Sequence, residues 1–257
     1  MSVRELFDLS GRTALVTGGS RGLGLAMAGA LGEMGAKVII TARKAEELDE
    51  ALSHLRSRGV EGVRVVGDLS RPEDVKALAD AALEAAAAPI DILVNNAGAT
   101  WGAPAEEHPL QGWEKVIDLN LTGTFLLTQQ IGVRSMIPRR YGRIVNIASV
   151  AGLKGSQHLK AIAYHTSKGG LVNFTRALAA EWGRHGITVN AICPGFIPSK
   201  MTQGLLDKIS ALVIASTPLR QLGDPRDLEG LVVLLSSAAT RHITGQAIAV
   251  DGGASVV

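Results

Sequence analysis

The chain has 257 residues, of which 46% are hydrophobic, a composition typical of a globular protein and unlike that of a disordered one. Its formal net charge is only +2, so nothing in the charge balance calls for nucleic acid or an anionic membrane as a partner. The single cysteine, Cys193, excludes an internal disulfide and fits a reducing compartment.

The N-terminal stretch MSVRELFDLSGR carries charges where a signal peptide needs an apolar run. No uncharged apolar window of about 18 residues occurs along the chain, and we therefore expect no membrane span and a cytoplasmic protein. The length suits one α/β domain that covers residues 1–257.

Short apolar runs that favour strands alternate with longer helical patterns. The expected strands lie at 13–18, 37–42, 63–68, 91–98, 142–149, 187–195 and 245–253. The expected helices cover 24–34, 45–59, 71–87, 112–137, 163–184 and 225–238. This alternation predicts a doubly wound, mostly parallel sheet of seven strands with helices on both faces. The irregular stretch 196–224 is long enough to be a substrate lid.

A glycine-rich loop, TGGSRGLG (17–24), joins the first expected strand to the first expected helix. Gly18, Gly22 and Gly24 would let the backbone turn sharply and approach a pyrophosphate, while the helix N-terminus supplies free N–H groups and a partial positive charge. A glycine loop alone is a weak signal that also fits a merely tight turn. Its place between strand and helix favours nucleotide binding.

The end of the second strand indicates which dinucleotide is bound. An acidic residue there would accept a hydrogen bond from the ribose 2′-hydroxyl of NAD, but Thr-Ala-Arg-Lys occupies 41–44, and no acid follows before Glu46. Arg43, together with Arg21 of the glycine loop, is suited to hold a 2′-phosphate through charge-assisted hydrogen bonds. We therefore expect NADP(H) in preference to NAD(H). The alternative is that both arginines are ordinary surface residues.

Seven motifs in order give the chain a resemblance to the short-chain dehydrogenase/reductase family. They are TGGSRGLG, GDLS, NNAG, DLNLTG, NIAS, YHTSK and NAICPG, and they extend over nearly the whole chain. The stretches NNAGATWGAPAEEHPLQGWEKV and PGFIPSKMT look like a subgroup that holds β-ketoacyl reductases and gluconate 5-dehydrogenases. The resemblance implies a Rossmann-type fold, interconversion of a ketone and a secondary alcohol by hydride transfer, and a homotetramer.

The resemblance also implies the residues of the site. The catalytic set would be Asn120, Ser149, Tyr164 and Lys168. Lys168 would also hold the nicotinamide ribose, Ser149 would orient the substrate oxygen, and Asn120 would hold a water that relays protons between Lys168 and solvent. The other cofactor contacts implied are Gly18, Ser20, Arg21, Gly22, Leu23, Gly24, Arg43, Asp68 and Leu69 at the adenine, Asn95, Ala97, Gly98, Pro194, Gly195, Ile197 and Ser199.

Tyr164 and Lys168 stand four positions apart, so on a helix they share one face. Reduction of a ketone needs a proton donor for the developing alkoxide, and a phenol with an ordinary pKa of about 10 is a poor acid–base group at neutral pH. A nearby ammonium would favour the phenolate and lower that pKa. The spacing alone is common by chance, and it gains meaning from the other motifs around it.

Two departures from the family pattern flank the expected substrate position. The stretch between Ser149 and Tyr164 is two residues longer than the commonest family spacing, and Ser199 stands where the family usually has threonine. The apolar segment 201–219 favours an acyl chain, and hence a β-ketoacyl thioester, over a sugar acid. A sugar acid such as 5-ketogluconate would need cationic groups, for which the nearby candidates are Lys154, His158, Lys160 and Lys200.

The histidines show no metal-binding spacing, and we expect no metal. A non-catalytic NADP-binding sensor is the alternative from another class of function. Such a protein would have no need of the complete set of Asn120, Ser149, Tyr164 and Lys168.

Overall fold

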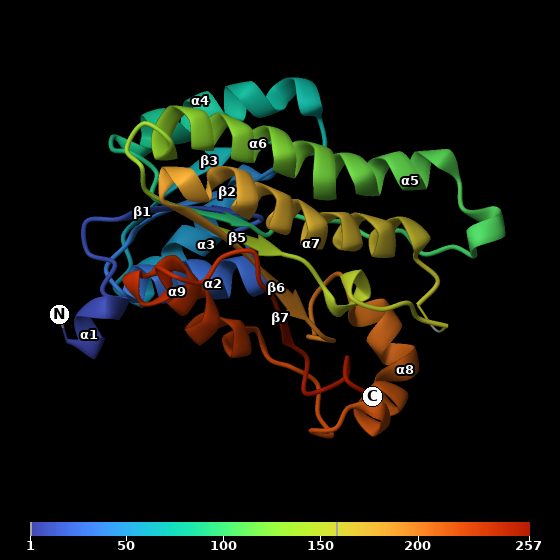
Figure 1. Ribbon diagram of the computed structural model, residues 1–257. Helices are drawn as coiled ribbons and strands as arrows, with labels where there is room; N and C mark the ends of the chain where they lie inside the picture. Colours follow the sequence, from blue (N-terminus) through green and yellow to red (C-terminus); the bar gives the residue numbers. More distant parts are fainter. Residues whose placement is uncertain (1, 158) are drawn as a thin grey trace.

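A single sheet of seven parallel strands forms the centre of the computed structural model, which describes residues 2–157 and 159–257 (Figure 1). The strands are β1 (Thr13–Thr17), β2 (Lys37–Ala42), β3 (Gly62–Val66), β4 (Ile92–Asn95), β5 (Gly142–Ile147), β6 (Ile187–Pro194) and β7 (Ala247–Val250). Their spatial order is β3-β2-β1-β4-β5-β6-β7. The order reverses between β1 and β4, and ligands of such sheets bind beyond the carboxyl ends of the strands at this switch point.

The inner strands are mostly apolar because both of their faces are covered. All residues of β1, β4, β5 and β6 are buried, as expected for parallel strands between two helical layers. Successive side chains alternate between the layers: Leu15 packs in the core on one face and Val16 in the core on the other. Each is fully buried, which stabilises the fold by roughly 1.5–3 kcal/mol per side chain.

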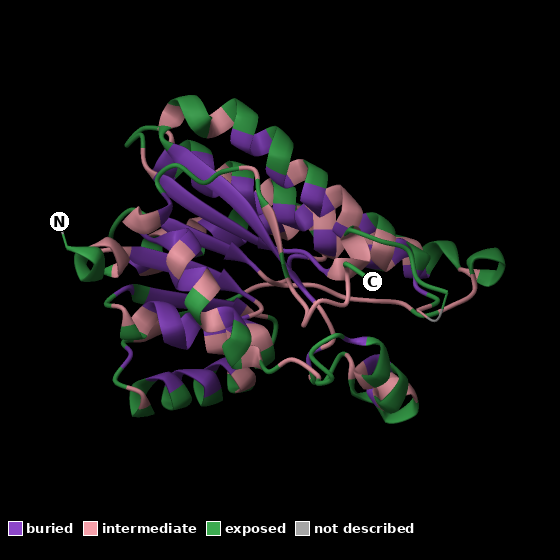
Figure 2. Ribbon diagram, turned by 60° about the horizontal axis from the view of Figure 1, so that its bottom comes forward, coloured by how far each residue is buried: buried purple, intermediate pink, exposed green. Residues whose placement is uncertain are grey.

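Helices cover both faces of the sheet, as Figure 1 shows. The core on one face is built with α2 (Gly22–Glu33), α3 (Ala45–Ser57) and α9 (Glu229–Ser236). The core on the other face is built with α4 (Val75–Ala86), α6 (Thr124–Ile131) and α7 (Ile162–Trp182). Figure 2 shows the buried residues concentrated in the sheet and the exposed residues on the outer faces of the helices. The predicted doubly wound α/β fold is confirmed.

The segment 112–137, predicted as one continuous α-helix, is interrupted by π-helical turns. The segment comprises α5 (Leu110–Ile117), a π-helical turn (Asp118–Gly123), α6 and a second π-helical turn (Gly132–Met136). The first π turn brings the backbone of Gly123 against the loop after β3, where a Cβ would lie 2.0 Å from the Leu69 carbonyl oxygen. Single π turns of this kind often occur at functional sites, and this one carries Asn120.

The structure also departs from the predicted elements at the end of β4, in the stretch 196–224 and at the N-terminus. The predicted strand 91–98 ends at Asn95, because the N–H groups of Asn96 and Ala97 donate to the side-chain oxygen of Thr17 instead of continuing the ladder. The stretch 196–224, expected to be irregular, contains α8 (Gln203–Ser216). A short N-terminal helix, α1 (Val3–Phe7), was not predicted. None of the helices in 2–157 and 159–257 combines the length and the apolar character needed to cross a bilayer.

Candidate active site

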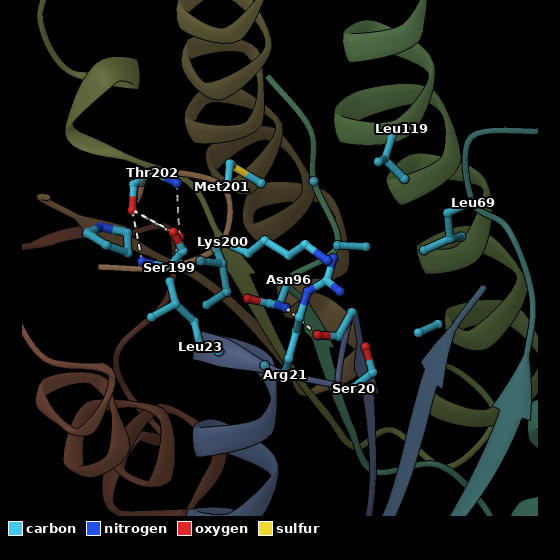
Figure 3. A pocket seen from close by; sticks show the side chains of 18 of the residues that line it. Ser20, Arg21, Leu23, Leu69, Asn96, Leu119, Ser199, Lys200, Met201 and Thr202 are labelled. Carbon is cyan, nitrogen blue, oxygen red and sulfur yellow. Dashed lines mark hydrogen bonds between the residues drawn. The ribbon is translucent and has the colours of Figure 1, made fainter. Parts of the chain in front are cut away.

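A cleft with a volume of about 590 Å³ opens at the carboxyl ends of the central strands. Its walls come from the glycine loop, the ends of β2, β4, β5 and β6, the face of α7 that carries Tyr164, and the segment 197–202 that precedes α8. The volume lies within the range of sites for small molecules and cofactors. Figure 3 shows Ser20, Arg21 and Leu23 lining the cleft on one side and Ser199 to Thr202 on another.

The glycines of the first loop have distinct structural roles. Gly18 has a left-handed φ of +63°, and a Cβ there would lie 2.9 Å from the Asn96 amide nitrogen. A Cβ on Gly24 would lie 2.2 Å from the Gly18 carbonyl oxygen, so the helix could not pack against the loop. Gly22, with a φ of +54°, instead faces open space in the cleft. Gly18 and Gly24 therefore hold the turn together, while Gly22 leaves the start of α2 accessible.

Asn96 fixes the glycine loop from the end of β4. Its side-chain amide donates to the carbonyl oxygens of Thr17 at 2.9 Å and Gly18 at 3.1 Å. The tight loop, the accessible N-terminus of α2 and the open space at Gly22 together fit a dinucleotide pyrophosphate. Ser20, Arg21 and Leu23 line the same part of the cleft.

The two arginines expected at a 2′-phosphate both line the cleft, in different surroundings. Arg43, at the end of β2, is exposed and has no ion-pair partner in the described part of the chain. Arg21 forms an ion pair with Glu47, its Nη1 lying 2.9 Å from each carboxylate oxygen. Sequence reasoning missed Glu47; its place in the first turn of the helix after β2 was the available signal.

Asp68 and Leu69 line the cleft where the adenine was expected. The Oδ1 atom of Asp68 accepts hydrogen bonds from the backbone N–H and the hydroxyl of Ser70, at 2.9 and 2.7 Å. This turn after β3 holds the carboxylate in one orientation.

Asn95 does not face the cleft, contrary to its predicted role as a cofactor contact. Its amide nitrogen donates to Thr128 Oγ1 at 2.9 Å and to Asn146 Oδ1 at 2.8 Å, and the side chain is buried. These bonds tie β4 to α6 and β5. The cleft is instead lined by Asn96, Ala97 and Gly98. The alternation of side chains along a strand explains why one asparagine faces the cofactor loop and its neighbour faces the core.

Lys168 lies on α7, one helical turn from Tyr164. Its Nζ is 5.7 Å from the centroid of the Tyr164 ring and donates to the Ile147 carbonyl oxygen at 2.7 Å. Only 4% of Lys168 is exposed, and this burial lowers the pKa of its ammonium to about 8. Burial in turn raises the pKa of the Tyr164 phenol, with a hydrogen bond from Ser149 opposing that rise.

The expected lowering of the Tyr164 pKa by Lys168 is therefore not the dominant effect, because burial raises that pKa. Desolvation acts on both groups and favours their neutral forms. A protonated phenol is the form that can donate a proton to an alkoxide. Burial thus favours the protonated form of the Tyr164 phenol.

Ser149 lies at the start of the turn that follows β5 and lines the cleft beside Tyr164. Its hydroxyl accepts a hydrogen bond from the Ala151 N–H at 3.1 Å, which fixes its rotamer. Ser149 and Tyr164 together place two hydroxyl groups where a substrate oxygen could be bound.

Asn120 is buried behind the cleft within the π turn. Its Oδ1 accepts from the Ala99 N–H at 2.8 Å, and its Nδ2 donates to the Ala99 carbonyl oxygen at 3.0 Å and to Ser167 Oγ at 2.9 Å. A Cβ on Gly98 would lie 3.3 Å from Asn120 Oδ1 and 3.5 Å from Lys168 Nζ. The glycine thus keeps side chains out of the space between them. The proton relay through Asn120 stays a prediction.

The segment after β6 brings Pro194, Gly195, Ile197 and Ser199 to the cleft. Ser199 Oγ lies 3.1 Å from Thr202 Oγ1, which also donates to the Ile197 carbonyl oxygen at 2.8 Å (Figure 3). Thr202 lines the cleft as well and was not predicted.

The four basic residues considered for an anionic substrate lie in different places. Lys154 donates to the carbonyl oxygens of Ala254 and Val257, so it anchors the C-terminal tail. Lys160 is exposed, and Lys200 lines the cleft. His158 lies outside the described residues.

Cys193 adds no reactive group to the cleft. Cys193 is fully buried, and this burial raises the pKa of its thiol to about 11. Within 2–157 and 159–257, no three His, Cys, Asp or Glu residues are grouped so that they could hold a metal ion.

Comparison with known proteins gives consistent matches over the whole chain. The family of short chain dehydrogenases matches residues 12–210. The chain is 39% identical to a gluconate 5-dehydrogenase of Gluconobacter oxydans, over 100% of this chain and 99% of that one. It is 41% identical to a rhamnolipids biosynthesis 3-oxoacyl-[acyl-carrier-protein] reductase of Pseudomonas aeruginosa, over 96% and 97%. A crystal structure of a gluconate 5-dehydrogenase from Burkholderia cenocepacia, in complex with NADP and tartrate, is 32% identical over 100% of both chains, with a TM-score of 0.93.

Proposed function

The chain belongs to the short-chain dehydrogenase family, and we propose that it reduces the ketone of a gluconate-type sugar acid with NADPH and catalyses the reverse oxidation. It is an NADP(H)-dependent oxidoreductase that acts on CH–OH groups. The observation that carries the proposal is the position of Ser149, Tyr164 and Lys168 along the same cleft as the glycine loop.

The chemistry divides between the cofactor and the chain. The cofactor supplies the hydride for the carbonyl carbon, and the protein must supply a proton for the oxygen. Tyr164 donates that proton, while the Ser149 hydroxyl orients the oxygen and stabilises its growing charge. Lys168, whose pKa of about 8 leaves it mostly charged at neutral pH, stabilises the phenolate that remains. Asn120 holds the loop at Ala99 and relays protons beyond Lys168.

The preference for NADP(H) rests on charge at the end of β2. Arg43 offers an exposed guanidinium without an ion-pair partner in the described residues, at the position where a carboxylate would favour NAD(H). A guanidinium binds a phosphate through parallel charge-assisted hydrogen bonds. Arg21 provides a second guanidinium across the same part of the cleft.

A sugar acid is the first choice of substrate because full-length similarity to gluconate 5-dehydrogenases recurs among both relatives and solved structures. A 3-oxoacyl thioester is the second. It is favoured by the similarity to the Pseudomonas reductase and by exposed apolar side chains on the proposed lid, 196–224: Met201, Leu212 and Leu219. An acyl chain could lie against this surface.

Direct competition between the two substrate classes tests the choice. We expect a kcat/KM for 5-ketogluconate at least tenfold above that for an acetoacetyl thioester, each measured with saturating NADPH. A higher kcat/KM for the acetoacetyl thioester would identify the acyl thioester as the substrate class, and the proposed reaction type would stay the same. NADPH binding without turnover of either substrate, or of a wider panel of ketones, would favour the sensor instead.

We also propose that the chain assembles as a homotetramer through the outer helices. Phe125 of α6 and Leu110 of α5 are large apolar residues that are 46% and 69% exposed. Exposed apolar side chains on neighbouring helices are typical of subunit contacts. Light scattering on the purified protein should give the mass of four chains, and the mass of one chain would contradict the assembly.

A further inference from the structure

The carboxylate of Glu47 is surrounded by cations at the edge of the cleft. Arg21 Nη1 lies 2.9 Å from both of its oxygens, and Lys44 Nζ lies 3.5 Å from Oε1. The Ser20 hydroxyl is 3.5 Å from Oε2. Glu47 itself is half-buried and, like Arg21, Lys44 and Ser20, lines the cleft.

Lys200, in the proposed lid, adds a third positive charge that acts on the same carboxylate. Burial alone would raise the pKa of Glu47, but the charges of Arg21, Lys44 and Lys200 together hold it below the usual value. Figure 3 shows the Lys200 side chain extending toward Arg21 from the opposite wall. Cations from the glycine loop and the start of α3 thus pair with one carboxylate, and Lys200 adds its charge from the segment before α8.

This arrangement makes Arg43 more available than Arg21 for binding a phosphate. Arg43 is free of ion pairs with described residues, whereas Arg21 is already engaged by a carboxylate with both oxygens in range. A 2′-phosphate that binds Nη1 of Arg21 must displace Glu47, and one that binds the other N–H groups of the guanidinium lies close to the carboxylate, so the two anions repel each other in either case. A ribose 2′-hydroxyl would meet no such repulsion, because it can donate a hydrogen bond to a carboxylate.

We propose that Glu47 is an internal counterion that competes with the cofactor 2′-phosphate for Arg21 and thereby limits the preference for NADPH over NADH. The inference rests on the proposed NADP(H) function and deepens it. Glu47 neutralises the cation cluster when no cofactor is bound. It weakens the binding of NADPH because it holds Arg21, and it offers a hydrogen-bond acceptor to the 2′-hydroxyl of NADH. The enzyme therefore keeps usable affinity for both cofactors, although no acid follows β2 directly.

Glu47→Gln tests the inference, with Glu46→Gln as the matched control. Glu46 is in the same helical turn, is exposed, and forms no ion pair with the residues described. Both variants remove one negative charge near the cleft. Dissociation constants for NADPH and NADH would be measured by the fluorescence of the reduced nicotinamide, with ADP and 2′,5′-ADP as calorimetric probes of the phosphate itself.

We expect Glu47→Gln to increase the affinity for NADPH and 2′,5′-ADP about three- to fivefold, the upper part of the range for an exposed ion pair, and to leave the affinity for NADH and ADP unchanged or lower. Glu46→Gln should change the dissociation constants of both cofactors by less than about twofold. Equal effects of the two variants, or equal tightening of NADPH and NADH, would overturn the inference alone. A wild-type enzyme that binds NADH but neither NADPH nor 2′,5′-ADP would overturn the proposed cofactor as well.

Discussion

Replacing Lys168 by methionine should reveal how much the fold is destabilised by burying a functional cation. The folded protein holds the pKa of Lys168 at about 8, whereas the unfolded chain should have a value near 10.5. Between these values the unfolded chain binds more protons than the folded one, so the wild-type protein gains stability as pH rises from 8 to 10.5. The full gain is roughly 3 kcal/mol, since each pKa unit corresponds to about 1.4 kcal/mol.

The assay compares the wild type with Lys168→Met in thermal unfolding without cofactor, at several pH values from 7 to 10.5. Other groups titrate in the same range in both proteins, so the difference in Tm isolates Lys168. We expect that difference to shift in favour of the wild type by roughly 2–4 °C per kcal/mol as pH rises. A difference that stays constant from pH 7 to 10.5 would refute the claim that burial lowers the pKa of Lys168.

Two substitutions separate catalysis from cofactor binding. Tyr164→Phe should lower kcat by about 100-fold or more, because it removes the proton donor, while the NADPH dissociation constant changes little. Tyr141→Phe alters the only other tyrosine and should retain activity. A near-normal kcat in Tyr164→Phe would exclude the assigned role. Arg43→Ala should raise the dissociation constant of NADPH about tenfold or more and that of NADH far less, as expected when one charge-assisted hydrogen bond to the 2′-phosphate is lost. The exposed Arg56 supplies the control substitution for Arg43, and equal losses for both cofactors would contradict the phosphate contact.

The architecture was predictable because its strongest signals are local. The fully buried strands β1, β4, β5 and β6 appear in the sequence as short, mostly apolar runs, and the spacing of the glycine loop fits a sharp turn from strand to helix. The positions of Ser149, Tyr164 and Lys168 in the cleft follow from the same order of elements, since the carboxyl ends of parallel strands share one edge of the sheet.

Features that depend on contacts between distant segments were not predictable. Asn95 and Asn96 are adjacent and chemically identical, yet one binds Thr128 and Asn146 in the core and the other holds the glycine loop. Lys154 has the charge expected of a substrate-binding residue, yet it donates to the backbone of the C-terminal tail about a hundred residues away in the sequence. Desolvation of Tyr164 and Lys168 likewise depends on everything packed around them, and helix spacing carries no information about it.

Transfer of deuterium from NADPH to the substrate carbon is the most direct test of the account. The wild-type enzyme would be incubated with NADPH labelled at C4 of the nicotinamide and with 5-ketogluconate or a 3-oxoacyl thioester, and the products would be analysed by mass spectrometry. The account predicts one deuterium on the new carbinol carbon of at least one product, and none with Tyr164→Phe on the same timescale. Oxidation of NADPH without deuterium in any alcohol product, or label transfer at an undiminished rate in Tyr164→Phe, would contradict it.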